Sequence, residues 1–437
     1  MYDMTKAMTS RASRRGVLKG GTALGLGAIG LGPVAGRVAS AQDGGQLEIF
    51  SWWTSPGEAT ALQTLFDAFL AEYGDVEIIN SAVAGGAGVN AQAVLQTRLQ
   101  GNEPPDSWQT HVGRELIDRY VVPGYSEPIT ELYEAEGWAE VMPAGLVEQA
   151  TWESEQYSVP VNVHRGNTLW YNRQVLEDNG IEVADTMSVD EFIAACDTLQ
   201  TAGVTPLAFS NQEGFQGSQM FESTLLGVAG PDTYNGLFRG ELTWDDEGAR
   251  QAAETYAQFL NYVNEDFPAL TWDAAINMVI EGRAAFNSMG DWAYGEVVAK
   301  DAVDNIGWVS HPGTDGSFVL VVDSFNLAVG APNREHALNW LRILGTKEAQ
   351  EAFNPLKGSI PARTDANRDI FSPYHQWSMD GFASDALVPS VAHGMGASPA
   401  FQQALLDASA AFVADKDVDT YLTMLTDAAA MDAEATA

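Results

Sequence analysis

Strand patterns alternate with helix patterns from residue 47 onward, and this order constrains the fold more than any other feature. The first helix pattern places Leu62, Leu65 and Phe69 on one stripe, with the spacing of a helix that covers a core. A strand, a helix and a second strand in this order favour a parallel sheet with helices on its faces. The sequence therefore predicts an α/β fold. The expected strands are residues 47–50 and 76–79, and the expected helices are residues 58–73 and 91–99.

The remainder of the chain continues the same mixture. Ser188 and Glu191 form the capping-box pattern that opens a helix, which we expect to run to Leu199. A long helix is expected over 247–263, and Lys357 is expected in a loop after a helix that ends near Phe353. Further strands are expected at 206–209, 284–287 and 318–322, and further helices at 335–344, 347–353, 400–413 and 418–430.

No low-complexity linker divides the chain, although 437 residues are enough for two or three domains. Two lobes without a linker would be joined by ordered strands. Residues 157–163 are apolar and extended, and they end in the unusual polar pair His164 and Arg165. Residues 358–363 are a second segment of this kind, so both are candidate crossings between lobes.

The charge of the chain excludes two classes of partner. With 22 basic and 59 acidic residues, the formal net charge is −37. A chain this acidic repels nucleic acid and anionic membrane surfaces. Cys196 is the single cysteine, so an intrachain disulfide and a cysteine-rich metal site are excluded. We expect no cofactor and no metal site.

The first 41 residues have the order of parts found in an export signal. Arg14 and Arg15 lie in a pattern that resembles the twin-arginine motif, and a Gly/Ala/Leu-rich stretch follows at 20–32. Residues 38–41 supply an A-x-A cleavage pattern, so we expect residues 1–41 to be a signal peptide. No cysteine is available there for lipid attachment, which favours a free periplasmic protein.

A glycine-rich motif at 86–91 matches the G-x-G-x-x-A pattern of dinucleotide-binding proteins. It follows the second expected strand rather than the first, and Asp106 lies in a Pro-Pro-Asp turn rather than at a strand end. We therefore interpret the motif as a tight turn, with Asn90 as the cap of the next helix.

Polar and aromatic residues follow several expected strand ends, where ligands gather in open α/β sheets. Trp52 and Trp53 are adjacent, and side chains of neighbouring residues point in different directions, so we expect at least one to face a cleft. Aromatic faces with amide, carboxylate and cationic groups suit a small neutral polyol, because rings pack on its C–H face and polar groups bind its hydroxyls. The groups in question are Trp52, Trp53, Gln109, His111, Trp272, Asp291, Trp292, Asp323, Lys357 and His393.

From residue 47 to its end, the chain resembles the extracellular solute-binding proteins, family 1, and within them the glucose-binding proteins. The resemblance is carried by residues 47–53, 85–91, 161–165, 290–292, 323–325 and 354–359. It implies a two-lobed periplasmic-binding-protein-like fold of type II, with the ligand in the cleft between the lobes. It also implies lobe 1 at 47–158 plus 310–355, and lobe 2 at 159–309 plus 356–437.

The resemblance carries a set of sugar-contacting residues over to this chain. Trp272 and Trp292 would be stacking residues. The remaining residues would be Trp52, Trp53, Glu58, Gln109, His111, Asp323, Lys357 and His393.

The function that follows is a periplasmic substrate-binding protein of an ABC sugar importer. We expect it to be a monomer and not an enzyme, to bind a monosaccharide, and to meet the importer's membrane subunits. Glucose ranks first, and galactose or mannose would differ from it by one hydroxyl. A secreted carbohydrate-active enzyme and an oligosaccharide binder are the alternatives. The chain contains no G-x-S-x-G pattern and no P-loop.

Overall fold

The computed structural model describes residues 45–212 and 214–436, and residues 44–437 cluster as one compact unit. The predicted twin-arginine signal and the cleavage site after Ala41 lie outside the described residues and stay predictions. Across residues 45–212 and 214–436, none of the helices combines the length and apolar character that crossing a membrane requires.

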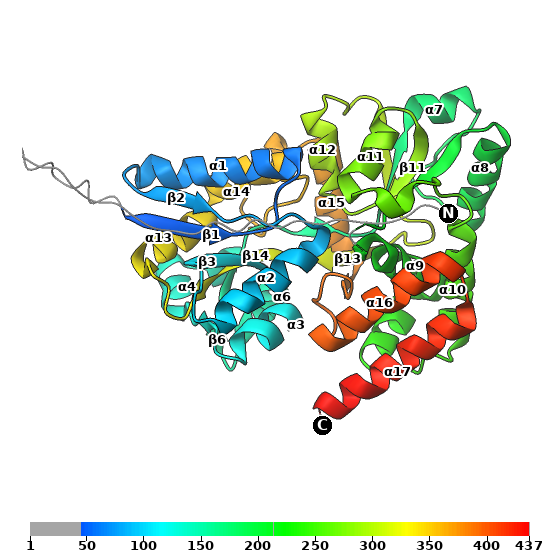
Figure 1. The fold of residues 1–437 in the computed structure, drawn as a ribbon. Coiled ribbons are helices and arrows are strands. Elements are labelled where there is room, and N and C mark those ends of the chain that lie inside the picture. The colour runs from blue at the N-terminus through cyan, green and yellow to red at the C-terminus, as the bar shows by residue number, and fades with distance from the viewer. Residues whose placement is uncertain (1–44, 213, 437) are drawn as a thin grey trace, which may run out of the picture. The chain divides into compact units, whose positions relative to one another are not determined.

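The first sheet has six strands (Figure 1). Its strands β1 and β2, with α1 between them in the chain, confirm the predicted β-α-β start. β1 pairs in parallel with β2 and β3, whereas β14 runs antiparallel to β3. Helices α1, α13 and α14 lie together over this sheet. Their apolar faces, which include Trp340 of α13, meet Phe325 of β14 in one core. The strands are β1 (Gln46–Phe50), β2 (Glu77–Asn80), β3 (Ser107–His111), β4 (Ser126–Glu127), β7 (Ser158–Pro160) and β14 (Asp323–Ala328).

Two further sheets and a short ribbon complete the strands. One sheet has the order β10-β11-β9-β12, and another the order β15-β13-β8. A core of its own, which includes Phe192, Phe221 and Phe286, lies around them. The strands are β8 (His164–Arg165), β9 (Thr168–Asn172), β10 (Thr205–Ala208), β11 (Ala284–Ser288), β12 (Ile306–Ser310), β13 (Ser317–Val321) and β15 (Ala386–Pro389), with the ribbon β5 (Thr151–Trp152) and β6 (Glu155–Gln156).

The predicted helices are present in the predicted order and cover the sheets (Figure 1). Other helices were not predicted, the long α9 among them. The helix α9 contains a break at Gly230, where φ is 80° before Pro231. The helices are α1 (Pro56–Glu72), α2 (Val89–Gln100), α3 (Arg114–Leu116), α4 (Thr130–Glu136), α5 (Trp138–Val141), α6 (Ala144–Gln149), α7 (Arg173–Asp178), α8 (Val189–Thr201), α9 (Phe215–Phe238), α10 (Glu247–Phe259), α11 (Trp272–Ile280), α12 (Ala293–Ala299), α13 (Arg334–Leu344), α14 (Lys347–Lys357), α15 (Pro373–Ser384), α16 (Pro399–Asp415) and α17 (Val418–Thr436).

The capping box at the start of α8 is confirmed. The Ser188 hydroxyl accepts from the Glu191 amide at 3.2 Å, and the Glu191 carboxylate accepts from the Ser188 amide at 2.8 Å. The prediction of Asn90 as a cap is wrong, because α2 begins at Val89 after Gly88. The Asn90 side chain donates to the Ala84 carbonyl instead, at 3.1 Å, and so closes the preceding turn.

Three predicted helix ends are wrong. α17 continues to Thr436 rather than ending at 430. α10 ends at Phe259 rather than at 263, because the Leu207 amide donates to the Tyr262 carbonyl and draws the chain toward the sheet. α14 continues through Pro355 to Lys357 instead of ending near 353. Gly358 supplies the left-handed cap there, with φ at 93° and its amide donating to the Asn354 carbonyl.

The two candidate crossing segments lie side by side. Val163 and Ile360 form an antiparallel bridge, with N–H···O distances of 2.7 and 3.0 Å. The α/β fold that the sequence predicts is thus confirmed. The bounds of the two lobes, 47–158 plus 310–355 and 159–309 plus 356–437, stay a prediction.

Candidate functional site

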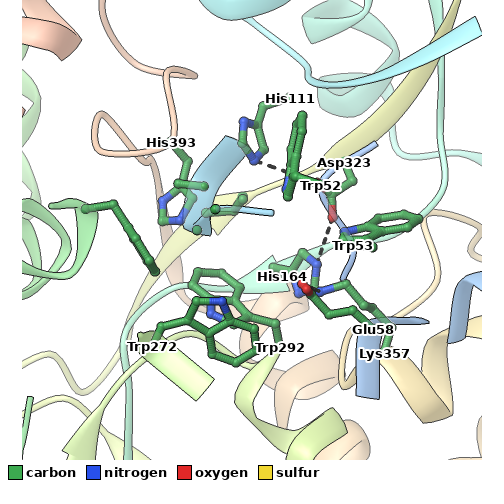
Figure 2. Close-up of a pocket in the computed structure, with 15 residues that line it drawn as sticks. Trp52, Trp53, Glu58, His111, His164, Trp272, Trp292, Asp323, Lys357 and His393 are labelled. Atoms are coloured by element: carbon green, nitrogen blue, oxygen red, sulfur yellow. Dashed lines mark hydrogen bonds and ion pairs between the residues drawn. The ribbon is translucent and has the colours of Figure 1, made fainter. Parts of the chain in front are cut away.

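Strand direction brings three predicted site residues to one edge of the first sheet. The carboxyl ends of the parallel strands β1 and β3 lead to Trp52 and His111. β14 runs the other way, so that its first residue, Asp323, pairs with His111 in register. Local strand order in the sequence therefore places an indole, an imidazole and a carboxylate together (Figure 2).

The other two sheets direct further side chains to the same place. His164 in β8 lies opposite Val321 in β13, two residues before Asp323. Trp292 follows the end of β11, and His393 follows the end of β15. Three sheets thus meet at one group of side chains, which explains why residues far apart in the chain converge.

These side chains line one pocket with about 370 Å³ of space between atoms, part of it open to solvent. The cavity itself measures only about 30 Å³. Pockets for small molecules measure roughly 300–1,000 Å³, so the walls of this one must move apart to admit a ligand. Nine of the ten predicted site residues line it. The lining consists of Trp52, Trp53, Glu58, Gly85, Gly86, Ala87, His111, His164, Phe215, Trp272, Trp292, Val321, Asp323, Lys357 and His393.

Gln109, the tenth predicted residue, lies behind the lining. Its Nε2 donates to Asp323 Oδ1 at 2.9 Å, and its Oε1 accepts from the Trp52 amide at 3.2 Å. The side chain is buried and both amide ends are occupied. Its place in the structure is that of a support for Asp323 and for the backbone of Trp52.

Aromatic rings form two facing walls of the pocket. Trp52 lies beside His111 on one side, and Trp272 and Trp292 lie on the other (Figure 2). Gly88 has a φ of 72°, and a Cβ on it would lie 2.7 Å from the Trp52 ring. The glycine-rich turn is therefore needed twice, for a left-handed backbone and for close approach to the indole.

Asp323 is the most heavily bonded carboxylate of the pocket. Its Oδ1 accepts from Gln109, and its Oδ2 accepts from Asn162 Nδ2 at 2.9 Å and contacts His164 Nε2 at 3.0 Å. Burial raises the pKa of Asp323, but the hydrogen bond and charge of His164 outweigh it, and the pKa lies well below its ordinary value. The group is therefore a fixed anion whose orientation is determined by its donors.

His164 connects Asp323 to a second buried carboxylate. Its Nδ1 contacts Asp291 Oδ1, while the other Asp291 oxygen accepts from the Arg165 amide at 2.9 Å. Burial lowers the pKa of His164, but the charge of Asp291 raises it above its ordinary value. His164 thus lies as an imidazolium between the carboxylates of Asp291 and Asp323. In this row of three groups, each charge has an opposite neighbour.

His111 and His393 lie with ring centroids 5.5 Å apart, and their pKa values are shifted in opposite directions. His111 Nδ1 contacts Glu115 Oε2 at 2.7 Å, and this carboxylate raises the pKa of His111 although burial opposes it. Burial holds the pKa of His393 well below its ordinary value. The pocket therefore favours the protonated form of one imidazole and the neutral form of the other.

Lys357 and Glu58 form an ion pair at the pocket edge. Lys357 Nζ lies 3.1 Å from Glu58 Oε1 and 5.6 Å from the centre of the Trp53 ring. Trp53 is 1% exposed and packs against Phe325 and Phe353, with centroids 5.6 and 5.0 Å away. Trp53 thus serves the core more than the pocket, whereas Trp52 is 7% exposed.

Sequence reasoning missed several residues of the lining. His164 was noticed only as part of an unusual polar pair, and this pair, at the end of an apolar segment, was a usable signal. Phe215 gave none, because it opens α9, a helix that the sequence did not predict. A Cβ on Gly86 would lie 1.9 Å from the Phe215 ring, so contact with the glycine turn positions this aromatic side chain.

Comparison with known proteins identifies relatives over most of the chain. Residues 64–382 match the model of the bacterial extracellular solute-binding protein family. A probable sugar-binding periplasmic protein of Mesorhizobium japonicum is 32% identical over 388 residues, 86% of this chain and 90% of that protein. A xylose/arabinose-binding protein of Haloferax volcanii is 30% identical over 360 residues, 81% and 78% of the two chains. A glucose-binding protein of Saccharolobus solfataricus is 25% identical over 334 residues, 70% and 59%.

Solved structures with a similar fold agree with these sequence relatives. A solved bacterial solute receptor, described as preferring β-D-galactopyranose, superposes with a TM-score of 0.79 at 18% identity, and the match covers 90% of this chain and 99% of that one. This likeness shows the two-lobed α/β fold of periplasmic binding proteins. The matched family model and the relatives of 30% identity or more agree with it. The chain belongs to the bacterial extracellular solute-binding protein family.

Proposed function

We propose that the protein is the periplasmic substrate-binding protein of an ABC importer for a neutral monosaccharide, with glucose as the first candidate. The observation that carries the proposal is one pocket in which indole rings face each other across fixed hydrogen-bonding groups. Indole faces pack against the C–H side of a pyranose, and carboxylate, ammonium and imidazole groups bind its hydroxyls.

The charges of the pocket favour a neutral ligand over an ionic one. Lys357 is paired with Glu58, and His111 is paired with Glu115. His164 lies between Asp323 and Asp291. Because each charged side chain already has a buried opposite charge, an ionic solute would bring a charge without a partner, which is costly in a buried site.

Relatives support a sugar and leave its identity to experiment. The names of the relatives specify glucose in one case and xylose or arabinose in another. We further propose export by the twin-arginine route, a monomeric state, and two lobes that close on the sugar.

Glucose is expected to bind with a dissociation constant near or below the micromolar range, about −8 kcal/mol or better. Thermal shift should rank glucose against galactose, mannose, xylose and arabinose, because a ligand of the folded state raises the melting temperature. Calorimetry then gives the affinity. No heat and no fluorescence change up to millimolar glucose would remove glucose from the proposal.

The same incubations distinguish a binding protein from an enzyme. Glucose and glucosides recovered after incubation with the protein should be chemically unchanged by NMR. A released aglycone or an altered sugar would support the carbohydrate-active alternative instead.

Lys357→Met is expected to weaken sugar affinity about 10- to 100-fold, because an ammonium supplies charge-assisted hydrogen bonds worth roughly 1.5–3 kcal/mol. Among the described residues Glu58 is its one acceptor, which leaves donor capacity for a ligand. Lys347→Met is the matched control on the same helix, because Lys347 forms an exposed pair with Glu351. Equal affinities of the two variants would exclude Lys357 as a ligand residue.

A further inference from the structure

A buried carboxylate outside the pocket holds the loop that carries His393. Glu222 lies within α9 and is 0% exposed. Its Oε1 accepts from the Ser390 hydroxyl at 2.6 Å, and its Oε2 accepts from the amides of Val391 and Ala392 at 2.9 and 3.1 Å. The Tyr234 hydroxyl lies 3.2 Å from the same oxygen. All these contacts converge on the loop that follows β15.

Ser390 links this carboxylate to the imidazole of the pocket. Ser390 Oγ lies 2.9 Å from His393 Nδ1 and also accepts from the His393 amide at 3.2 Å. A serine hydroxyl has one proton to donate. When that proton goes to an ionised Glu222, the serine oxygen must accept from Nδ1, and His393 then carries its proton on Nδ1. When Glu222 is protonated and donates to Ser390, the serine hydroxyl donates to Nδ1 instead, and His393 then carries its proton on Nε2.

We propose that Glu222 is a positioning residue that acts through Ser390 to keep the proton of His393 on Nδ1, so that Nε2 faces the pocket as a hydrogen-bond acceptor. This inference rests on the proposed sugar-binding function. His393 lines the pocket, and in the part of the chain that the structure describes no protein group bonds its Nε2. The sugar hydroxyl that meets Nε2 must then donate.

The neighbouring imidazole has the opposite character. Glu115 contacts His111 directly at Nδ1 and raises the pKa of that ring, which favours the protonated form in which Nε2 also donates. The two carboxylates lie on different elements, Glu115 in α3 and Glu222 in α9. They thus give different roles to two rings whose centroids are 5.5 Å apart. A ligand that fits both must accept at one hydroxyl and donate at the other, which is a basis for stereochemical selection.

The tautomer of His393 can be measured without any ligand. Burial raises the pKa of Glu222 to about 7, so the carboxylate is ionised at pH 8.5. At that pH, ¹⁵N-resolved NMR of the imidazole should show His393 protonated on Nδ1. In Glu222→Gln the amide NH₂ donates to Ser390, and the proton of His393 should move to Nε2. The same tautomer in both proteins would overturn the proposal, whether or not the protein binds glucose.

Monofluorinated glucoses test the effect on binding, because a C–F group accepts weakly and cannot donate. In the parent protein, one analogue should bind about tenfold more weakly than glucose, and this penalty should vanish in His393→Ala. In Glu222→Gln the penalty for that analogue should fall below about threefold. An unchanged penalty in Glu222→Gln would contradict the assignment.

Two further variants control for folding and charge. Ser390→Ala leaves the amide and tyrosine contacts of Glu222 in place and should release the tautomer of His393 to a mixture. Asp246→Asn makes the same change of charge at the cap of α10, away from the loop. It should leave the tautomer and the fluorosugar penalties as in the parent, and a shift there would show that loss of charge alone explains the result.

Discussion

Asp323→Asn is expected to weaken glucose binding about 100-fold and to lower the melting temperature of the sugar-free protein. Both carboxylate oxygens accept hydrogen bonds in the structure, from Gln109 on one side and from Asn162 on the other. An asparagine has one oxygen and one NH₂, so in either orientation a donor faces a donor. Removing one member of a buried charge pair costs about 2–5 kcal/mol.

The substitution also changes the charge balance of the pocket. His164 lies between two carboxylates, and with asparagine at 323 its ring retains only Asp291 as an anionic neighbour. The pKa of His164 should fall as a result, which NMR titration measures independently of any ligand. An unchanged pKa would contradict the charge pairing described for this row.

Asp106→Asn is the matched control for this experiment. Asp106 is also buried beside β3 and accepts from the amides of Glu48 and Asn333, at 2.7 and 2.6 Å. It does not line the pocket, so its substitution should lower the melting temperature while calorimetry finds the affinity of the parent. If both variants lose affinity equally, Asp323 acts through general stability and not as part of a binding site.

Trp52→Ala and Trp53→Ala are expected to have opposite effects. Trp52 borders the pocket, and loss of a stacking indole should cost about 2–4 kcal/mol of binding with little change in the apo melting temperature. Trp53 packs against Phe325 and Phe353, and its truncation should cost about 3–5 kcal/mol of folding stability.

Calorimetry and thermal denaturation of both variants separate these effects. Trp52→Phe retains an aromatic face and should recover a large part of the affinity that Trp52→Ala loses. A destabilised Trp52→Ala with the affinity of the parent would assign Trp52 to the core and would remove one wall of the proposed sugar site.

Strand order explains why much of the site was predictable. Trp52 and His111 follow parallel strands, and Asp323 begins a strand that interrupts an apolar pattern, so each carries a signal in its own neighbourhood. The role of Gln109 was less accessible. Its position in β3 is evident from the sequence, but only tertiary contacts show that its amide is consumed by Asp323 and by the Trp52 backbone.

The errors in the fold have tertiary causes. Proline at 355 is a reasonable signal for a helix end, yet α14 continues because the left-handed Gly358 caps it three residues later. α10 ends early because a strand amide binds the carbonyl of Tyr262. Glu222 has ordinary sequence surroundings, and its partner Ser390 lies more than a hundred residues away in the chain. The polar pair at 164–165 gave a signal for His164, but its partner Asp323 is equally distant in the sequence.

The internal pairing of the pocket charges has a consequence for salt. A neutral sugar adds no charge to a set in which Lys357 meets Glu58 and His164 meets two carboxylates. Ionic strength shortens the Debye length from about 10 Å at 0.1 M to about 3 Å at 1 M, and this screening acts on the strongly acidic exterior. Buried pairs are screened much less. Capture of a neutral solute by this pocket would therefore proceed with nearly constant affinity from dilute medium to brine, while the surface charge keeps the molecules apart.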